Sequence, residues 1–334
     1  MEILNIVWFI LIMILFTGFF ILEGFDYGVG MLLFGKNDYE RSTFVRAIGP
    51  VWDANEVWMI TAGGALFAAF PHVYATMFST FYLALFLMLL ALILRGVAFE
   101  LRGKFPAHSW RKGWDCAIFF GSIVPALLWG VAMANLIKGL PIDPNMHYLG
   151  TFFDLLSPYT ILSGLTFVTL FLFHGANFLS LKVADGRLLL QLKKIAPCAG
   201  ITAFVIYLFF VCLTSQTANI SAFKIFASPF GVAAICLFAA TTSAFRERFK
   251  SAFIFTTLSI AGLNIGLFVS LFPNLMISSL NPDWSLNIYN AASTPHTLAI
   301  MTGAAVVLVP IVLIYQAWTY RIFKERVTAG DLKH

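Results

Sequence analysis

The stretches GFFILEGFDYGVG (residues 18–30) and GPVWDANEVWMITAGGALFAAF (residues 49–70) decide the fold and the functional class of this chain. Both lie in long apolar runs, yet they contain four carboxylates, Glu23, Asp26, Asp53 and Glu56. A charged side chain at the centre of a membrane-spanning helix costs about 2.5–3.5 kcal/mol. Because that cost needs a compensating role, these carboxylates are the first candidates for a functional site.

The composition of the whole chain is that of a membrane protein. Of its 334 residues, 60% are hydrophobic and only 11% are charged, whereas soluble domains carry about 25% charged residues. The net charge of +5 does not indicate nucleic-acid binding, because the basic residues form short clusters between apolar runs. Such clusters are typical of cytoplasmic loops. We therefore predict an all-α integral membrane protein with no nucleic-acid partner.

The apolar runs predict the number of transmembrane helices. A spanning helix needs about 20 predominantly apolar residues. Nine such runs occur, near residues 3–31, 52–71, 74–98, 115–136, 157–180, 195–214, 229–245, 250–272 and 297–320. The connections between them leave no room for a soluble domain. We therefore expect a single membrane domain, residues 1–334, with nine transmembrane helices.

The basic residues predict the orientation of these helices. All of the 21 Lys and Arg residues except Lys138 and Lys224 follow odd-numbered runs, within residues 36–46, 95–112, 182–194, 246–250 and 321–333. Positively charged loops stay in the cytoplasm. The amino terminus is therefore expected outside and the carboxyl terminus in the cytoplasm.

The spacing of the carboxylates favours a shared function. Glu23 and Asp26 are three residues apart, so they share one face of a helix, and Asp53 and Glu56 repeat this spacing. Asn55, Trp52 and Trp58 accompany the second pair. With the predicted orientation, all four carboxylates lie on the cytoplasmic side, as at the opening of a proton relay.

A second interpretation of these acids requires no catalytic role. Asp53 and Glu56 are also compatible with first-turn acids stabilised by the helix dipole, and Trp52 and Trp58 with an interfacial aromatic belt. Glu23 and Asp26 would lie at the membrane surface if the first helix ended near Leu22. Gly24 and Gly28 form a G-x-x-x-G spacing that allows close packing of a second helix.

Two further residues, Arg95 and His174, have two interpretations each. Arg95, at the end of the third run, is either the partner of a buried carboxylate or a cytoplasmic anchor, and Glu100 follows it. His174, in the fifth run, is a weak candidate for a haem ligand or proton carrier, although a packing histidine is more common at such a place. The sequence shows no metal-site spacing of His or Cys residues.

Taken together, the motifs resemble those of one known family. They are GFDYGVGML (24–32), GPVWDANEVWMITAGGALFAAFP (49–71), LRGVAFELRGK (94–104), WRKGWD (110–115), GSIVP (121–125), FPNLMISS (272–279) and VPIVLIYQAWTY (309–320). They extend over nearly the whole chain, and the second block is specific. In these motifs the chain resembles subunit II of the cytochrome bd-type quinol oxidases.

The resemblance implies a heterodimer with a homologous nine-helix subunit I. Subunit I would hold the quinol site and the ligands of two b-type haems and one d-type haem. The complex would oxidise quinol, reduce dioxygen to water and take its protons from the cytoplasm, which generates a proton-motive force in a bacterial or archaeal cell membrane. Subunit II would have two four-helix bundles plus one extra helix, and would supply the interface, part of a proton pathway and support for the haem region.

The family motifs match individual residues of this chain to different degrees. Trp52, Asp53 and Asp26 match family positions, whereas Glu23 and Glu56 lie where members vary between acids and amides. The resemblance leaves open whether a small third subunit is present, which quinol is used and whether a quinone binds to this chain. Extensive lipid contact is expected from the many Phe residues.

Two other classes of function remain possible from the residues alone. A proton-coupled secondary transporter would use the carboxylates as coupling groups, although the inverted repeats of many transporters are not evident in the sequence. A purely structural assembly subunit would use them for stability alone. Copurification with a haem-bearing partner separates the transporter from the other two.

Overall fold

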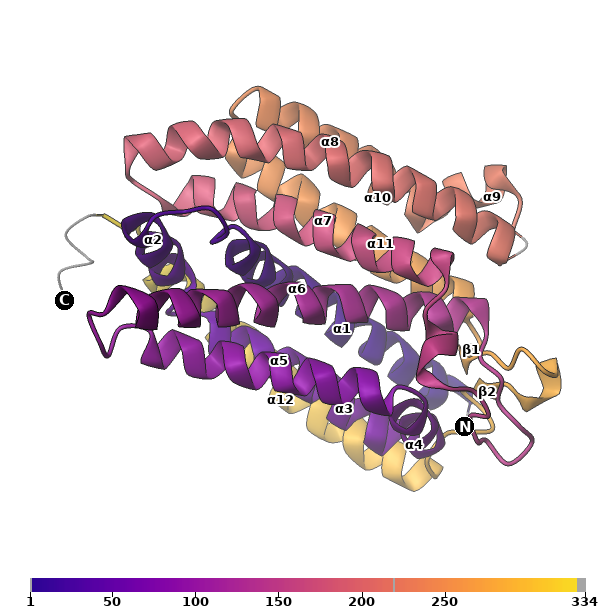
Figure 1. Ribbon diagram of the computed structural model, residues 1–334. Coiled ribbons are helices and arrows are strands. Elements are labelled where there is room, and N and C mark those ends of the chain that lie inside the picture. Colours follow the sequence, from indigo (N-terminus) through magenta and orange to yellow (C-terminus); the bar gives the residue numbers. More distant parts are fainter. Residues whose placement is uncertain (1, 219, 329–334) are drawn as a thin grey trace.

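The computed structural model describes residues 2–218 and 220–328. Its elements are α1 (Glu2–Met31), α2 (Asp38–Ile48), α3 (Trp52–Ala69), α4 (Pro71–Thr80), α5 (Tyr82–Leu101), α6 (His108–Lys138), η1 (Phe152–Leu155), α7 (Pro158–Lys182), α8 (Gly186–Thr217), α9 (Ala222–Phe226), α10 (Pro229–Phe245), α11 (Phe249–Leu271), β1 (Asn274–Met276), η2 (Pro282–Trp284), β2 (Leu286–Asn287) and α12 (Pro295–Ile322). The long helices lie side by side, as expected for an all-α membrane protein (Figure 1).

The first helix is the centre of the packing. α1 contacts α3, α6, α7 and α11, while α7, α8, α10 and α11 pack against one another. Two glycines bring α1 and α7 close together: a Cβ on Gly28 would lie 2.0 Å from the carbonyl oxygen of Phe171, and one on Gly175 would lie 2.5 Å from the carbonyl carbon of Gly28. The predicted packing role of Gly28 is therefore confirmed.

The nine predicted segments are mostly helical, but they differ in length and apolarity. Seven of the described helices are long and apolar enough to cross a membrane: α1, α5, α6, α7, α8, α11 and α12. α10 is a shorter apolar helix. α3 is not in this group, because Asp53, Asn55 and Glu56 lower the apolar character of its first turns. The multi-pass character of the protein is clear.

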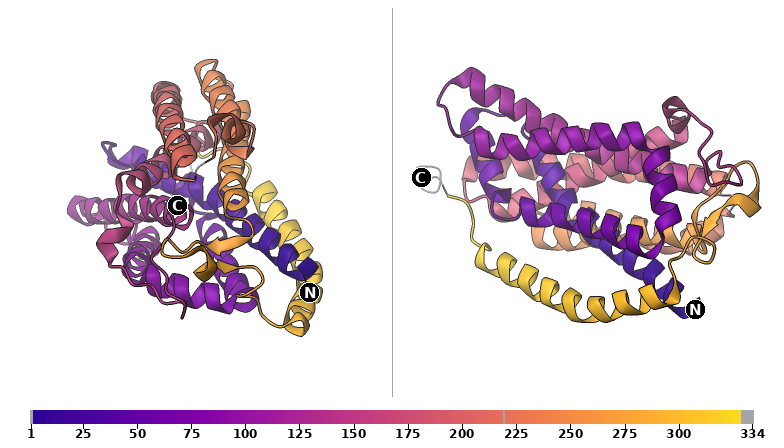
Figure 2. Two further views of the ribbon diagram at one scale, coloured as in Figure 1. Left: turned by 90° about the vertical axis from the view of Figure 1, so that its right-hand side faces the viewer. Right: turned by 90° about the horizontal axis from the view of Figure 1, so that it is seen from below.

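The predicted third span, residues 74–98, is not one helix. The chain forms α4 up to Thr80, turns at Phe81, and begins α5 at Tyr82. Pro71 occupies the first turn of α4, where its missing N–H is not needed. α4 crosses the end of the bundle between α3 and α5 (Figure 2). Apolar composition continues through this turn, so a hydropathy pattern does not reveal it.

The two ends of the helical bundle differ in charge. α2 and the connections α5–α6, α7–α8 and α10–α11 all lie at the end where α12 finishes, and they contain most of the basic residues (Figure 1). α1 begins at the opposite end. There, the α6–α7 and α11–α12 connections pack on each other, with Leu140 N–H donating to the Ile277 carbonyl at 2.9 Å.

Candidate functional site

A buried polar cluster joins α1, α3 and α5 near the basic end of the bundle. Glu23 and Asp26 come from α1, Asn55 and Glu56 from α3, and Arg95 from α5. Four of the five are 0% exposed as residues, and the side chain of Glu56 is 20% exposed. α1 continues as a helix to Met31. The interpretation that the first helix ends near Leu22 and leaves its acids at the surface is therefore wrong.

Arg95 is the cationic centre of this cluster. Its Nη1 donates to an oxygen of Glu23 and, at 3.0 Å, to Oε1 of Glu56. The guanidinium also lies 4.8 Å from the ring centroid of Tyr27 and 5.3 Å from that of Phe99. One cation thus faces two carboxylates in a region of low dielectric constant, which strengthens each contact. Of the two roles predicted for Arg95, partner of a buried carboxylate or cytoplasmic anchor, the structure shows the first.

Asp26 belongs to a neighbouring branch of the cluster. Its Oδ2 accepts a hydrogen bond of 2.6 Å from Nδ2 of Asn55. Oδ1 of Asn55 in turn accepts hydrogen bonds from Nε2 of Gln316, at 3.1 Å, and from the hydroxyl of Tyr320, at 2.8 Å. Gln316 and Tyr320 lie one turn apart on α12. This branch therefore links α1, α3 and α12 through side chains alone.

Several polar atoms of the cluster remain available for further hydrogen bonds. Glu23 Oε2, Asp26 Oδ1, Tyr27 OH, and Nε and Nη2 of Arg95 are buried and have no hydrogen-bond partner among the described residues. Buried polar groups are normally hydrogen-bonded to protein or to ordered water. Such a concentration of donors and acceptors is chemically suited to exchanging protons with water.

Asp53 and Glu100, by contrast, lie outside this cluster. Both residues are exposed, and neither side chain forms a hydrogen bond or ion pair with another described residue. Trp52 is half-buried and packs on Phe99, with ring centroids 4.9 Å apart. Trp58 is also half-buried and covers Gly18. The predicted pair Asp53 and Glu56 therefore separates into an exposed acid and a largely buried one.

His174 is a buried histidine whose two ring nitrogens both have protein partners. Nδ1 lies 2.7 Å from the hydroxyl of Thr256, and Nε2 lies 3.2 Å from the carbonyl oxygen of Ile21. The imidazole also stacks on Phe253, with ring centroids 4.5 Å apart. These contacts are those of a packing histidine and leave neither nitrogen free to coordinate iron. Among the described residues, no group of three or more His, Cys, Asp or Glu side chains is arranged for a metal ion.

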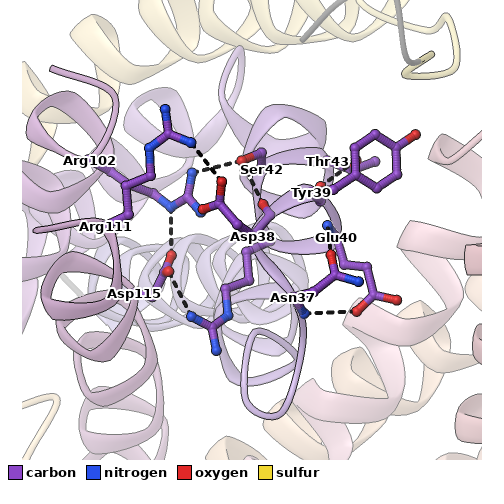
Figure 3. A network of polar contacts seen from close by, with 10 residues as sticks. Asn37, Asp38, Tyr39, Glu40, Ser42, Thr43, Arg102, Arg111 and Asp115 are labelled. Carbon is purple, nitrogen blue, oxygen red and sulfur yellow. Dashed lines mark hydrogen bonds and ion pairs between the residues drawn. The ribbon is translucent and has the colours of Figure 1, made fainter. Parts of the chain in front are cut away.

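A second ionic network fixes α2 to the ends of α5 and α6 (Figure 3). Arg102 donates to Asp38 at 2.9 Å and to Asp115 at 2.6 Å, and Arg111 donates to Asp38 at 2.6 Å. Partial burial acts to raise the pKa of Asp38, but the hydrogen bond from Arg111 and the charge of Arg102 outweigh it, so that the pKa is lowered. This network lies between α2, the end of α5 and the first turns of α6, and is a structural clamp.

An apolar cavity in the bundle does not include the carboxylates. It has a volume of about 620 Å³ and an apolar lining from α1, α3, α4, α5, α6 and α11, including Phe16, Met59 and Trp129. The buried cluster is therefore distinct from a ligand cleft of the usual kind.

Tyr27, Gln316 and Tyr320 belong to the cluster but are not among the site residues predicted from the sequence. Gln316 and Tyr320 are polar residues four positions apart in an otherwise apolar helix, which places them on one face. This spacing is the signal that would have revealed them.

Comparison with known proteins places the chain in a family. The family model for cytochrome bd terminal oxidase subunit II matches residues 4–323. The chain is 41% identical, over 98% of both chains, to cytochrome bd ubiquinol oxidase subunit 2 of Bacillus subtilis. It is 35% identical to cytochrome bd-I ubiquinol oxidase subunit 2 of Escherichia coli K12, over 99% of this chain and 97% of that one.

A solved structure of bd oxidase from Geobacillus thermodenitrificans has a similar fold, with a TM-score of 0.78 over 96% of this chain and 98% of the other, at 16% sequence identity. The family model matches almost the full length of the chain, and both relatives match it over nearly their whole length. Together these matches establish the family. The chain belongs to the cytochrome bd terminal oxidase subunit II family.

Proposed function

We propose that this chain is the second subunit of a quinol oxidase in the aerobic respiratory chain. The complex oxidises quinol, reduces dioxygen to water and generates a proton-motive force. Family membership supports this proposal, because relatives that match over nearly their full length are named ubiquinol oxidase subunits. The chain acts within the complex and does not itself hold the reacting groups.

The haems are held mainly by the partner subunit I. The complex contains b-type and d-type haem, and the weak candidate ligand of this chain, His174, is better explained by packing. Both of its ring nitrogens lie within hydrogen-bond distance of protein atoms, and its ring stacks on Phe253. Its role is therefore to support the contact of α7 with α1 and α11.

The arrangement in the bacterial cell membrane follows the charge of the loops. The chain forms one membrane domain, residues 1–334, with nine spans, two four-helix bundles and one extra helix. The amino terminus is outside, and the carboxyl terminus is cytoplasmic. The gathering of basic loops at one end of the bundle supports this orientation (Figure 1). Lys333 and the final residues lie outside the described residues.

The carboxylates form part of a proton pathway from the cytoplasm. The observation that carries this proposal is the inward decrease in exposure: Asp53 is exposed, the Glu56 side chain is 20% exposed, and Glu23 and Asp26 are 0% exposed. Protons for dioxygen reduction cross an apolar wall only where such groups and water relay them. Arg95 holds Glu23 and Glu56 in place, while Oε2 of Glu23 and Oδ1 of Asp26 have no hydrogen-bond partner among the described residues.

Subunit I docks on the face that contains α12. Only Leu298 and Thr319 of α12 are buried in the isolated chain, and Asp53 and Glu100 are exposed without a charged partner among the described residues. A partner surface compensates such acids better than lipid does. Lipid covers the remaining apolar surface, and a small third subunit is compatible with it.

The test uses the intact complex, purified through a tag on this chain. We expect a second large subunit, reduced-minus-oxidised bands of b-type and d-type haem, and quinol-dependent oxygen uptake. Asp26→Asn and Asp53→Asn should each lower turnover or change its pH profile while the haem bands persist. Glu325→Gln, an exposed acid at the same end, is the control. A colourless solitary protein would refute the assignment, and unchanged profiles in both variants would refute the proton pathway.

A further inference from the structure

The Asn55 amide uses its full hydrogen-bonding capacity at the junction of α1, α3 and α12. Nδ2 donates to Asp26 at 2.6 Å and approaches the Leu22 carbonyl at 3.5 Å. Oδ1 accepts from Gln316 at 3.1 Å and from Tyr320 at 2.8 Å. An amide has two donor hydrogens and two acceptor lone pairs, and all four are engaged here.

These four side chains also have one alternative arrangement. An Asn amide is oriented by its partners, and its oxygen and nitrogen can exchange places. In the reverse arrangement, a protonated Asp26 donates its O–H to Oδ1 of Asn55, and Nδ2 of Asn55 donates toward α12. The Gln316 amide adapts by turning over, because it offers an acceptor as readily as a donor.

Tyr320 does not adapt as easily as Gln316. Its hydroxyl donates its proton to Asn55, and the side chain of Gln316 lies within hydrogen-bond reach of the same hydroxyl. In the reverse arrangement the hydrogen bond from Tyr320 to Asn55 is lost, which costs free energy at a largely buried site. The hydroxyl therefore favours the arrangement in which Asn55 presents its N–H to a carboxylate.

We propose that Tyr320 is a positioning residue of the proton pathway, holding the Asn55 amide so that Asp26 faces an N–H donor and is kept ready to accept a proton. The inference rests on the proposed function, since it assigns a role within the same pathway. α12 runs along the outside of the bundle (Figure 2). Its packing is slight, because only Leu298 and Thr319 are buried. Thus α12, the helix proposed to contact subunit I, also influences the protonation state of Asp26 through Asn55.

The test compares Tyr320→Phe with Tyr289→Phe in the intact, tagged oxidase complex. Tyr289 lies in the connection between α11 and α12 and is 51% exposed, and its hydroxyl has no hydrogen bond to a described residue. Loss of the Tyr320 hydrogen bond should move the alkaline limb of the turnover profile to higher pH by about half to one unit. Tyr289→Phe should leave the profile unchanged.

Infrared difference spectra give a second readout that does not depend on turnover. The carboxyl C=O band of Asp26, identified by its loss in Asp26→Asn, should change frequency in Tyr320→Phe and stay constant in Tyr289→Phe. An unchanged band and profile in Tyr320→Phe, with an altered profile in Asp26→Asn, would overturn this inference and leave the pathway standing. A wild-type profile in Asp26→Asn would remove the pathway role of Asp26 and this inference together.

Discussion

Replacing Arg95 by methionine should strongly destabilise the protein. Arg95 is 0% exposed and is the cation shared by Glu23 and Glu56. Methionine fills much of the same apolar volume but leaves both carboxylates without the guanidinium. Glu23 has no access to solvent, whereas the Glu56 side chain is 20% exposed. Removing Arg95 therefore destabilises the protein mainly through Glu23, whose buried charge loses its partner.

The size of this destabilisation can be worked out from the distances in the structure. At the 3.0 Å separation of Arg95 and Glu56, the Coulomb energy is about 5.5 kcal/mol for an effective dielectric constant of 20. Removing one partner of a buried ion pair costs about 3–5 kcal/mol net. This corresponds to a fall in melting temperature of roughly 5–10 °C. The assay is thermal inactivation of the detergent-purified complex, followed by haem absorbance and by size-exclusion chromatography.

A second substitution tests the reasoning. Glu23→Gln in the Arg95→Met background should restore more than half of the lost melting temperature, because Glu23 is the one of Arg95's two carboxylate partners that water does not reach. Glu56→Gln in the same background should restore less. Equal or better recovery with Glu56→Gln, or full stability of Arg95→Met alone, would refute the assignment of Glu23 as the acid that depends on Arg95.

Three further predictions concern stability and haem binding. Because the pKa of Asp38 is lowered in the folded protein, its ion pairs stabilise the protein above about pH 4 and lose this effect as pH falls through the folded pKa. Asp38→Asn should therefore reduce the free energy of unfolding at pH 7 by less than about 1 kcal/mol, seen as a lower melting temperature, and should match the wild type well below pH 4. Gly28→Ala should disrupt the contact of α1 with α7 and cost about 1–3 kcal/mol or more, whereas Gly303→Ala, with no atom near its added Cβ, should be neutral in the same melting assay. His174→Phe should lower the melting temperature by breaking two hydrogen bonds and leave the haem bands of the complex unchanged; loss of a haem band would contradict its packing role.

The sequence by itself determined the class of the protein and the positions of most helices. Long apolar runs separated by basic loops are sufficient to predict a membrane protein, because the bilayer excludes unpaired backbone groups. The helical period alone places Glu23 and Asp26 on one face. The motifs around Asp26 and Asp53 identified the family. The turn at Phe81 was missed, because its neighbours are as apolar as the helices it joins.

Only the tertiary structure decided which polar side chains meet. Asp53 and Asn55 are two residues apart, about 200° around the helix, and one is exposed while the other is buried. α3 has apolar residues on every side, so its sequence pattern does not fix its rotation. The hydrogen bond from Tyr320 to Asn55 joins residues that are 265 positions apart in the chain. It depends on how α12 lies against α3, which is set by the packing of whole helices and not by any local pattern.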